Sequence, residues 1–274
     1  MATFFIEQFG CRATQADAVA IERQLRDRGY SASADAGSAD VVVVNTCTVT
    51  ASADLQARQA IHAIHRQNRA ARIVVTGCYA QRAPEELATI QGVAWVVGNS
   101  HKPEIPRLIQ EMTPPFVAGK SAGLVVIAPV GGEPLSLEQG PAKILSGDIL
   151  ELREMLVAPV EGGESGHTRP VLKIQDGCDS RCSYCVIPQV RGRSRSLDPG
   201  RVVEEIRMLA GRGAREVVLS GIDLGNYGRD LTPRTDLGGV LRRILDETPI
   251  ERLRVSSIEP MDVTADLLAV FTEC

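Results

Sequence analysis

The chain has 274 residues, of which 44% are hydrophobic and 23% are charged, and its formal net charge is −4. These are ordinary values for a globular protein, and the length suits one large domain or two of ordinary size. The negative charge excludes a uniformly basic surface, so any contact with nucleic acid has to come from local patches. No run approaches the roughly 18 apolar residues of a membrane span, and the N-terminus does not resemble a signal peptide.

The first hundred residues alternate strand and helix signals. Short apolar runs predict strands over 3–6, 41–44, 73–76 and 95–97. Helical patterns predict helices over 15–27, 54–68, 84–90 and 103–111. The strand at 41–44 is apolar without a break, which is typical of a parallel strand covered on both faces. The alternation therefore predicts a doubly wound parallel sheet.

The pattern weakens between residues 114 and 166, where Gly and Pro recur and one helix is predicted over 148–156. We interpret this stretch as a segment that connects a domain of residues 1–113 to a second domain of residues 167–274.

The second domain alternates in the same way. Strands are predicted over 171–174, 216–219 and 253–256, and helices over 199–212, 237–246 and 264–271. Three such units cannot close an eight-stranded barrel. They make either an unusually small α/β domain or part of a larger one, and we expect the sequence to be a fragment of a longer protein.

The seven cysteines are an odd number in a chain without a predicted export signal, which favours metal or redox chemistry over a disulfide framework. Three of them, Cys178, Cys182 and Cys185, follow the spacing C-x3-C-x2-C directly after a predicted strand. Three thiolates satisfy three irons of a cubane cluster and leave the fourth open to a small molecule. A zinc site would require a fourth Cys or His close by. The spacing therefore predicts a 4Fe–4S cluster.

Cys11, Cys47 and Cys78 each follow a predicted strand of the first domain. The carboxyl ends of parallel strands meet at one edge of the sheet, so these three cysteines can meet in space. Small buried cysteines are the alternative. Their identical placement favours a second cluster, with an open iron for exogenous sulfur. Gly10 and Gly77 precede two of them and would let the backbone approach a bulky group.

Several local sequences resemble known families. In the radical S-adenosylmethionine superfamily the pattern is C-x3-C-x-aromatic-C, and Tyr184 fills the aromatic position. Phe-Gly-Cys-Arg at 9–12, Val-Asn-Thr-Cys-Thr-Val-Thr at 44–50, Val-Thr-Gly-Cys-Tyr-Ala-Gln at 75–81 and Gly-Asn-Ser-His-Lys at 98–102 resemble the N-terminal domain of the methylthiotransferases. The branch they resemble most modifies N6-threonylcarbamoyladenosine in tRNA. Two residues depart from the pattern: Thr14 stands where asparagine is common, and Gln189 where an aromatic is usual.

The resemblance implies an α/β fold in which the doubly wound domain is followed by the first half of a radical-SAM partial (βα) barrel. It implies two 4Fe–4S clusters and S-adenosylmethionine as cofactors, with Cys178, Cys182 and Cys185 catalytic. It also implies a set of residues that face S-adenosylmethionine. Alternatively, these residues only form turns and cap helices. That set is Tyr184, Gly221, Asp223, Ser256, Ser257 and Glu259.

The function implied is C2 methylthiolation of N6-threonylcarbamoyladenosine at position 37 of tRNA. The second cluster would reduce S-adenosylmethionine to a radical that abstracts the C2 hydrogen; the first would supply sulfur, and another S-adenosylmethionine the methyl group. Alternative substrates are isopentenyladenosine in tRNA and an aspartate of a ribosomal protein. A different alternative is a non-catalytic iron–sulfur or RNA-binding remnant. We expect a cytoplasmic monomer that acts with tRNA and a flavodoxin- or ferredoxin-type reductant, without a membrane.

Two basic stretches are candidates for RNA contact. Arg191, Arg193 and Arg195 alternate after the second cysteine cluster, and in an extended segment they would share one side. Such a strip would contact phosphate or hold the carboxylate of the cofactor, unless it is a solvated loop. The other stretch is either an RNA contact or a solvated helix face. It comprises Arg58, His62, His65, Arg66, Arg69 and Arg72.

Overall fold

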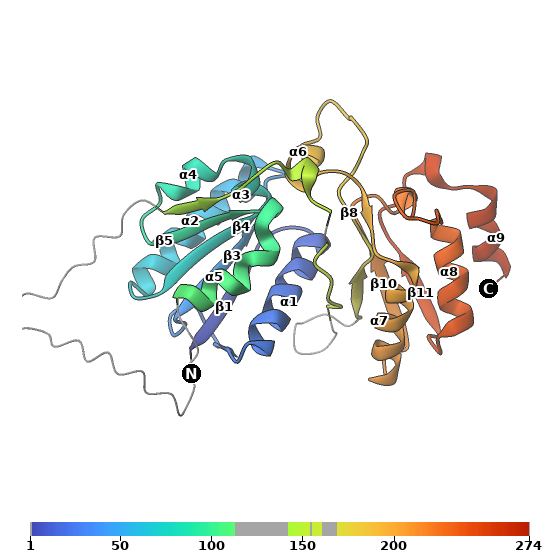
Figure 1. Ribbon diagram of the computed structural model, residues 1–274, viewed down its shortest axis with the longest axis horizontal. Helices are drawn as coiled ribbons and strands as arrows, with labels where there is room; N and C mark the ends of the chain where they lie inside the picture. The colour runs from blue at the N-terminus through green and yellow to red at the C-terminus, as the bar shows by residue number, and fades with distance from the viewer. Residues whose placement is uncertain (1, 113–141, 154, 161–168, 274) are drawn as a thin grey trace, which may run out of the picture.

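The computed structural model describes residues 2–112, 142–153, 155–160 and 169–273. These residues form two α/β units that lie side by side, with helix α1 (Arg12–Asp27) at the boundary between them (Figure 1). Most of the predicted connecting segment, residues 114–166, lies outside the described residues. No helix in the described ranges is both long enough and apolar enough to cross a membrane.

The first unit contains a six-stranded parallel sheet. Its strand order is β2-β1-β3-β4-β5-β6, so the chain reverses direction across the sheet between β1 and β3. In this register Val43 lies opposite Ile6 on one side and Val74 on the other. The strands are β1 (Thr3–Gln8), β2 (Ser31–Ala32), β3 (Val41–Thr46), β4 (Arg72–Gly77), β5 (Val93–Gly98) and β6 (Lys143–Leu145).

Helices cover both faces of this sheet because the central strands are apolar on both sides. Val43 packs with Ile21 of α1 and with α5 (Ile105–Met112) on one face. Val44 packs with Ile61 of α2 (Ala51–Gln67) and with α4 (Pro84–Ala88) on the other. A short helix α3 (Cys78–Arg82) follows β4, and the 3-10 helix η1 (Asn99–Glu104) follows β5. The doubly wound parallel sheet predicted from the sequence is confirmed.

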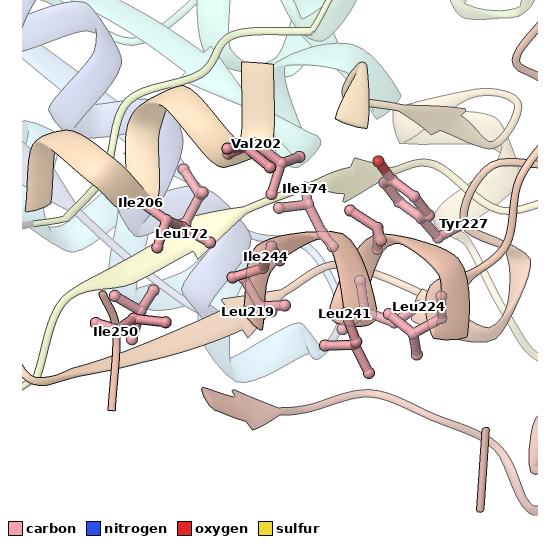
Figure 2. Packing of buried hydrophobic residues seen from close by; sticks show 14 of the residues in the cluster. Leu172, Ile174, Val202, Ile206, Leu219, Leu224, Tyr227, Leu241, Ile244 and Ile250 are labelled. Carbon is pink, nitrogen blue, oxygen red and sulfur yellow. The ribbon is translucent and has the colours of Figure 1, made fainter. Parts of the chain in front are cut away.

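The second unit has a three-stranded parallel sheet in the order β11-β10-β7. Figure 2 shows Leu172 and Leu219 of this sheet packed against Ile206 and Ile244 of the helices. The parallel βα alternation is the expected one. The elements are β7 (Val171–Lys173), α7 (Pro199–Gly211), β10 (Glu216–Ser220), α8 (Leu237–Glu247), β11 (Arg252–Val255) and α9 (Ala265–Glu273).

A small antiparallel pair holds the segment that contains the second cysteine triad. It joins β8 (Gln175–Asp176) to β9 (Arg195–Ser196), with α6 (Ile187–Arg191) between them in the chain. Side-chain caps start two helices of the second unit: Asp198 accepts from the backbone at the start of α7, and Asp236 from Gly239 N at the start of α8.

The two units share a buried interface. Alternation along β7 turns Val171 and Lys173 away from the helices of the second unit. Val171 and Val218 pack instead with Ala16 of α1 and with Val160, which pairs with Val171 through the backbone. One face of the second sheet therefore lies against the first unit.

The helix predicted over 148–156 is wrong for the residues that the structure describes there. Residues 143–145 form β6 on the open edge of β5, and Ile149–Glu151 is a single 3-10 turn, η2. Lys143 stacks its ammonium over the Trp95 ring at 5.3 Å, and Ile149 is buried. Strand pairing and packing outweigh the weak helical preference of this segment.

Candidate functional site

The first cysteine triad lies at the carboxyl edge of the six-stranded sheet. Cys11 precedes α1 directly, Cys47 follows β3, and Cys78 opens α3 after β4. Cys11 and Cys47 therefore flank the point between β1 and β3 where the chain reverses direction. Ligands of open parallel sheets bind in the crevice at such a point.

The geometry brings the three thiols together. A Cβ added to Gly10 would fall 2.6 Å from Cys47 Cβ and 2.9 Å from Cys47 Sγ, so Gly10, at φ +104°, lets Cys47 pack against the loop that carries Cys11. Burial raises the pKa of the Cys47 thiol, and the neighbouring Cys78 and Cys11 raise it further. Cys47 and Cys78 are buried, whereas Cys11 is exposed.

These residues fit an iron–sulfur cluster by the chemistry of their donor set. Three thiols from three loops can each take a different iron of a cubane. In the described parts of the chain no three His, Cys, Asp or Glu side chains converge closely enough to share one metal ion. A cubane spreads its ligands over several irons, so it does not require such close convergence.

The second triad lies in the loop between β8 and α6. Cys178 N donates to Gly192 O at 3.1 Å, which closes the loop, and Cys185 N donates to Cys182 O at 3.0 Å. Ser180 N donates to Cys178 Sγ at 3.4 Å. Burial raises the pKa of the Cys178 thiol, and the nearby carboxylate of Asp223 adds to this. Cys182 is exposed and Cys185 is half-buried. One short loop therefore presents three thiols.

Asp223 links this loop to the end of strand β10. Its Oδ2 lies 3.7 Å from Cys178 Sγ and accepts a hydrogen bond from Asn226. Its Oδ1 is buried and has no hydrogen-bond partner among the described residues. A buried carboxylate oxygen without a partner is costly, and it fits a site that receives a polar ligand. Gly221 lies two residues before it, against Gln175.

The other residues expected to face S-adenosylmethionine lie on the exposed rim. Tyr184 is 90% exposed. The neighbouring Cys182 has the largest effect on the pKa of Tyr184 and raises it, and Glu259 raises it by a smaller amount. Glu259 is exposed at the start of the 3-10 helix η4 (Pro260–Asp262). Ser257 adopts a positive φ of 58° and accepts Leu224 N through its carbonyl at 2.9 Å. Ser256 Oγ donates to Leu219 O at 3.2 Å. The rim therefore places Tyr184 and Glu259 within electrostatic reach of each other.

The prediction that three arginines form an exposed strip is wrong. Arg191 and Arg195 are 2% and 7% exposed, and of the three only Arg193 is exposed. The segment is not extended throughout, because Arg191 ends helix α6 and Gly192 turns the chain. Arg191 donates to Asp176 at 2.9 and 3.0 Å and to Asp17 of the first unit at 3.2 Å.

The second basic stretch follows helix α2 and the loop after it. Arg58 donates to the hydroxyl of Tyr79 at 2.6 Å and is half-buried, whereas Arg66, Arg69 and Arg72 are exposed. Helix α2 begins four residues after Cys47. A rise of 1.5 Å per residue places Arg66 about 20 Å from that end of the helix. The exposed arginines therefore lie away from the cysteine edge.

Four charged residues at the interface, unlike Arg191, were not predicted as part of the site. Asp17 lies on the buried stripe of α1, four residues before Ile21. A carboxylate at this position of an apolar stripe predicts a buried polar partner from the sequence alone. The network of ion pairs around Asp17 joins both units. Its members are Asp17, Lys102, Lys173, Asp176 and Arg191.

Comparison with known proteins matches this arrangement of two units. Residues 3–98 match the uncharacterized protein family UPF0004, and residues 172–273 match the radical SAM superfamily. The chain is 35% identical over 266 residues to the threonylcarbamoyladenosine tRNA methylthiotransferase MtaB of Aquifex aeolicus, which covers 96% of this chain and 57% of that protein. Over nearly its whole length the chain is therefore similar to the radical S-adenosylmethionine methylthiotransferases.

Other methylthiotransferases agree with this placement. MtaB of Bacillus subtilis is 33% identical, over 98% of this chain and 54% of its own length. The tRNA-2-methylthio-N(6)-dimethylallyladenosine synthase of Geobacter sulfurreducens is 30% identical, over 98% of this chain and 55% of its own length. The chain thus spans about half the length of the curated relatives it matches.

A solved structure shares the fold. The radical S-adenosylmethionine methyltransferase TsrM of Kitasatospora setae, with cobalamin and a [4Fe-4S] cluster bound, aligns with a TM-score of 0.60 and 18% identity. The alignment covers 99% of this chain and 57% of that one. The expected fold class is confirmed. Radical SAM proteins use S-adenosylmethionine and a 4Fe–4S cluster, so the match of residues 172–273 supports the cofactors expected from the sequence.

Proposed function

We propose that this chain acts in the methylthiolation of tRNA at C2 of N6-threonylcarbamoyladenosine 37. The observation that carries the proposal is the pair of cysteine triads, one on each of two parallel-sheet units that share a buried interface. Relatives at 35% and 33% identity bear the name of this activity. The dimethylallyladenosine synthase at 30% identity makes isopentenyladenosine in tRNA the competing substrate.

Cys11, Cys47 and Cys78 would hold one 4Fe–4S cluster and Cys178, Cys182 and Cys185 the other. When bound, such clusters supply electrons and sulfur, and S-adenosylmethionine supplies a radical and a methyl group. The protein's own part is to bind, orient and exclude water. Asp223 is suited to orient the cofactor, because it lies beside Cys178 and has one buried oxygen without a described partner.

Tyr184, Gly221, Ser257 and Glu259 complete the proposed S-adenosylmethionine site. Gly221 follows β10 directly and leaves room where a Cβ would meet Leu224 and Gln175. Tyr184 and Glu259 stand on the exposed rim of the same loop cluster. An exposed aromatic at the rim suits the flat face of an adenine.

Of the three arginines predicted to contact RNA, only Arg193 is exposed, and we assign the contact to it. Its exposed guanidinium lies in the chain between the cysteine loop and β9, and it can donate two hydrogen bonds to a phosphate. The exposed arginines at the end of α2 and after it form a second candidate surface. We place the reaction in the cytoplasm, with the chain as a monomer and a flavodoxin- or ferredoxin-type protein as electron donor. The free thiols of all six triad cysteines suit a reducing compartment.

The test is anaerobic reconstitution of the chain with iron and sulfide. We expect about eight iron atoms per chain, and about four after either triad is changed to alanine. With S-adenosylmethionine and dithionite, the chain should release 5′-deoxyadenosine, and the Cys178→Ala, Cys182→Ala, Cys185→Ala variant should not.

Substrate is tested with tRNA from a strain that lacks the modification. Mass spectrometry of the nucleosides should show a methylthio group on threonylcarbamoyladenosine. Product on isopentenyladenosine alone would reject the proposed substrate. Full cluster loading without any 5′-deoxyadenosine would favour a non-catalytic iron–sulfur protein.

A further inference from the structure

A small cavity lies between helices α1 and η1 of the first unit and helix α6 of the second unit. It measures about 20 Å³, which is room for about one water molecule. Side chains of both units line it, so it lies at the interface between them. The polar ones are Asp17, Asn99, Lys102, Lys173, Asp176, Arg191 and Arg195.

Asn99 connects the first triad to the second unit. Its Nδ2 donates to Val190 O at 2.7 Å and lies 3.6 Å from Cys78 Sγ. The acceptor at Val190 fixes which end of the amide is the nitrogen. Asn99 is 6% exposed, and its Oδ1 has no hydrogen-bond partner among the described residues. One amide NH2 group thus links a proposed cluster ligand to α6.

Positive charge is in excess around this cavity. Within the described part of the chain, four cationic side chains are buried there with two carboxylates, Asp17 and Asp176. The excess is two charges when Lys102 is protonated. Arg191 interacts electrostatically with Cys78 and Cys11, and Lys102 interacts with Cys78. A cluster held by the first triad would therefore supply negative charge near this excess.

The identity of the cations supports this assignment. Lys173 is bound by both carboxylates, whereas Lys102 has only Asp17. Arg191 Nε is buried without a hydrogen-bond partner among the described residues, although its two terminal nitrogens are paired with Asp17 and Asp176. Among the cations of this network, Lys102 and Arg191 are the two that interact electrostatically with Cys78, and Lys102 has one carboxylate partner where Lys173 has two.

We propose that Asn99, Lys102 and Arg191 are positioning residues that set the reduction potential of the cluster held by Cys11, Cys47 and Cys78. This inference rests on the proposed function, because it requires a cluster at the first triad. Hydrogen bonds to the sulfurs and the surrounding charge are two determinants of cluster potential. Reduction adds negative charge, so an N–H donor and buried cations stabilise the reduced state and raise the potential. Because Arg191 and Val190 belong to the second unit, docking of the two units is part of this tuning.

The experiment uses the 274-residue chain with Cys178, Cys182 and Cys185 all changed to Ala, so that only the first triad binds iron. After anaerobic reconstitution, the reduced fraction is followed by electron paramagnetic resonance during a redox titration. The variants Asn99→Leu, Arg191→Met and Lys102→Met are compared with this parent. We expect each to lower the reduced-to-oxidised ratio at the parent's midpoint at least tenfold, which is about 59 mV for one electron. Iron should remain at about four per chain.

Two controls separate tuning from structural damage. Arg191→Lys keeps the positive charge and should stay within about threefold of the parent ratio. Arg107→Met removes an exposed arginine on α5 and should change nothing. Midpoints unchanged in the three test variants, with iron retained, would overturn the inference, and so would loss of iron from all three. A parent that binds no iron would instead reject the cluster at the first triad, and with it the proposed function.

Discussion

Gln175 joins three segments of the second unit through a single buried amide. Its Nε2 donates to Gly177 O at 2.8 Å and Ser194 Oγ at 2.9 Å, and its Oε1 accepts from the backbone N–H groups of Ile222 and Asp223 at 2.9 Å each. The residue is fully buried. The cysteine loop, the approach to β9 and the turn after β10 therefore depend on one side chain. Networks of this kind are stabilising only while every member is paired.

Gln175→Leu should weaken the second cluster site. The change removes this partner from two backbone N–H groups and two backbone carbonyls, and each buried group left unpaired costs about 1–3 kcal/mol. We expect the free energy of unfolding to fall by about 3 kcal/mol or more. In a chain whose Cys11, Cys47 and Cys78 are all alanine, the reconstituted iron should also fall below half of the parent value. Urea denaturation and iron analysis measure the two effects.

The matched control is Gln56→Leu, which changes an exposed glutamine on α2. It should leave both quantities unchanged. If Gln175→Leu kept full iron and full stability, the amide would have no part in holding the cysteine loop.

At the scale of elements, the turn from β4 into α3 places Cys78. Gly77 has φ +103°, and a Cβ there would meet the backbone of Thr46 on the neighbouring strand, 2.6 Å from its nitrogen. Thr46 Oγ1 also donates to Thr76 O at 2.6 Å, so the ends of β3 and β4 lie closely together. Only glycine combines this conformation with this approach.

Gly77→Ala should therefore destabilise the first unit and disturb its cysteine site. Strain and overpacking together cost about 2–5 kcal/mol. The control is Gly213→Ala, which has a similar φ of +93° but no atom within 4 Å of the added Cβ. It should cost about 1 kcal/mol, from backbone strain alone. Urea denaturation of both variants compares them; equal losses would show that the contact with Thr46 adds nothing.

The elements that could be predicted from the sequence are those with a long periodic signal. The strand at Val41–Thr46 and the helix at Ala51–Gln67 each match an apolar pattern that the buried faces impose. The unpredicted elements are two to five residues long, such as β8 and α6. Their conformation depends on partners elsewhere in the fold, so local sequence carries little of it.

The positions of the cysteines were predictable for the same reason. Cys47 and Cys78 closely follow apolar strands, and topology then brings their loops to one edge. The burial of Arg191 was not predictable from the sequence. Its carboxylate partners are Asp176, 15 residues before it, and Asp17, 174 residues before it. Only the docking of the two units shows that this arginine is buried.

At the scale of the whole molecule, Asp17 is the centre of the interface between the units. It lies on α1 and binds Lys102 of its own unit at 2.9 Å, together with Lys173 and Arg191 of the other unit. Burial alone would raise the pKa of Asp17, but these three cations overcome that effect and lower the pKa to about 2. Burial also opposes ionisation of Asp176, and Arg191 and Lys173 lower its pKa. Both carboxylates are therefore ionised throughout the neutral and mildly acidic range.

Loss of this carboxylate should uncouple the two units. Asp17→Asn leaves three buried cations short of one partner, and breaking a buried pair costs about 3–5 kcal/mol. We expect a free energy of unfolding lower by about that amount at pH 7, with the second unit unfolding at a lower urea concentration than the first.

The stabilisation from Asp17 is present above the pKa of an unfolded aspartate, near 3.9, and is lost as the pH falls through the pKa of Asp17 in the folded chain. The difference between wild type and variant should therefore be constant from pH 7 to 5 and shrink from pH 5 towards 3. Urea denaturation at each pH, with exposed Asp27→Asn on the same helix as control, measures it. A difference that stayed constant down to pH 3, or one no larger than that of the control, would show that Asp17 does not hold the units together through its charge.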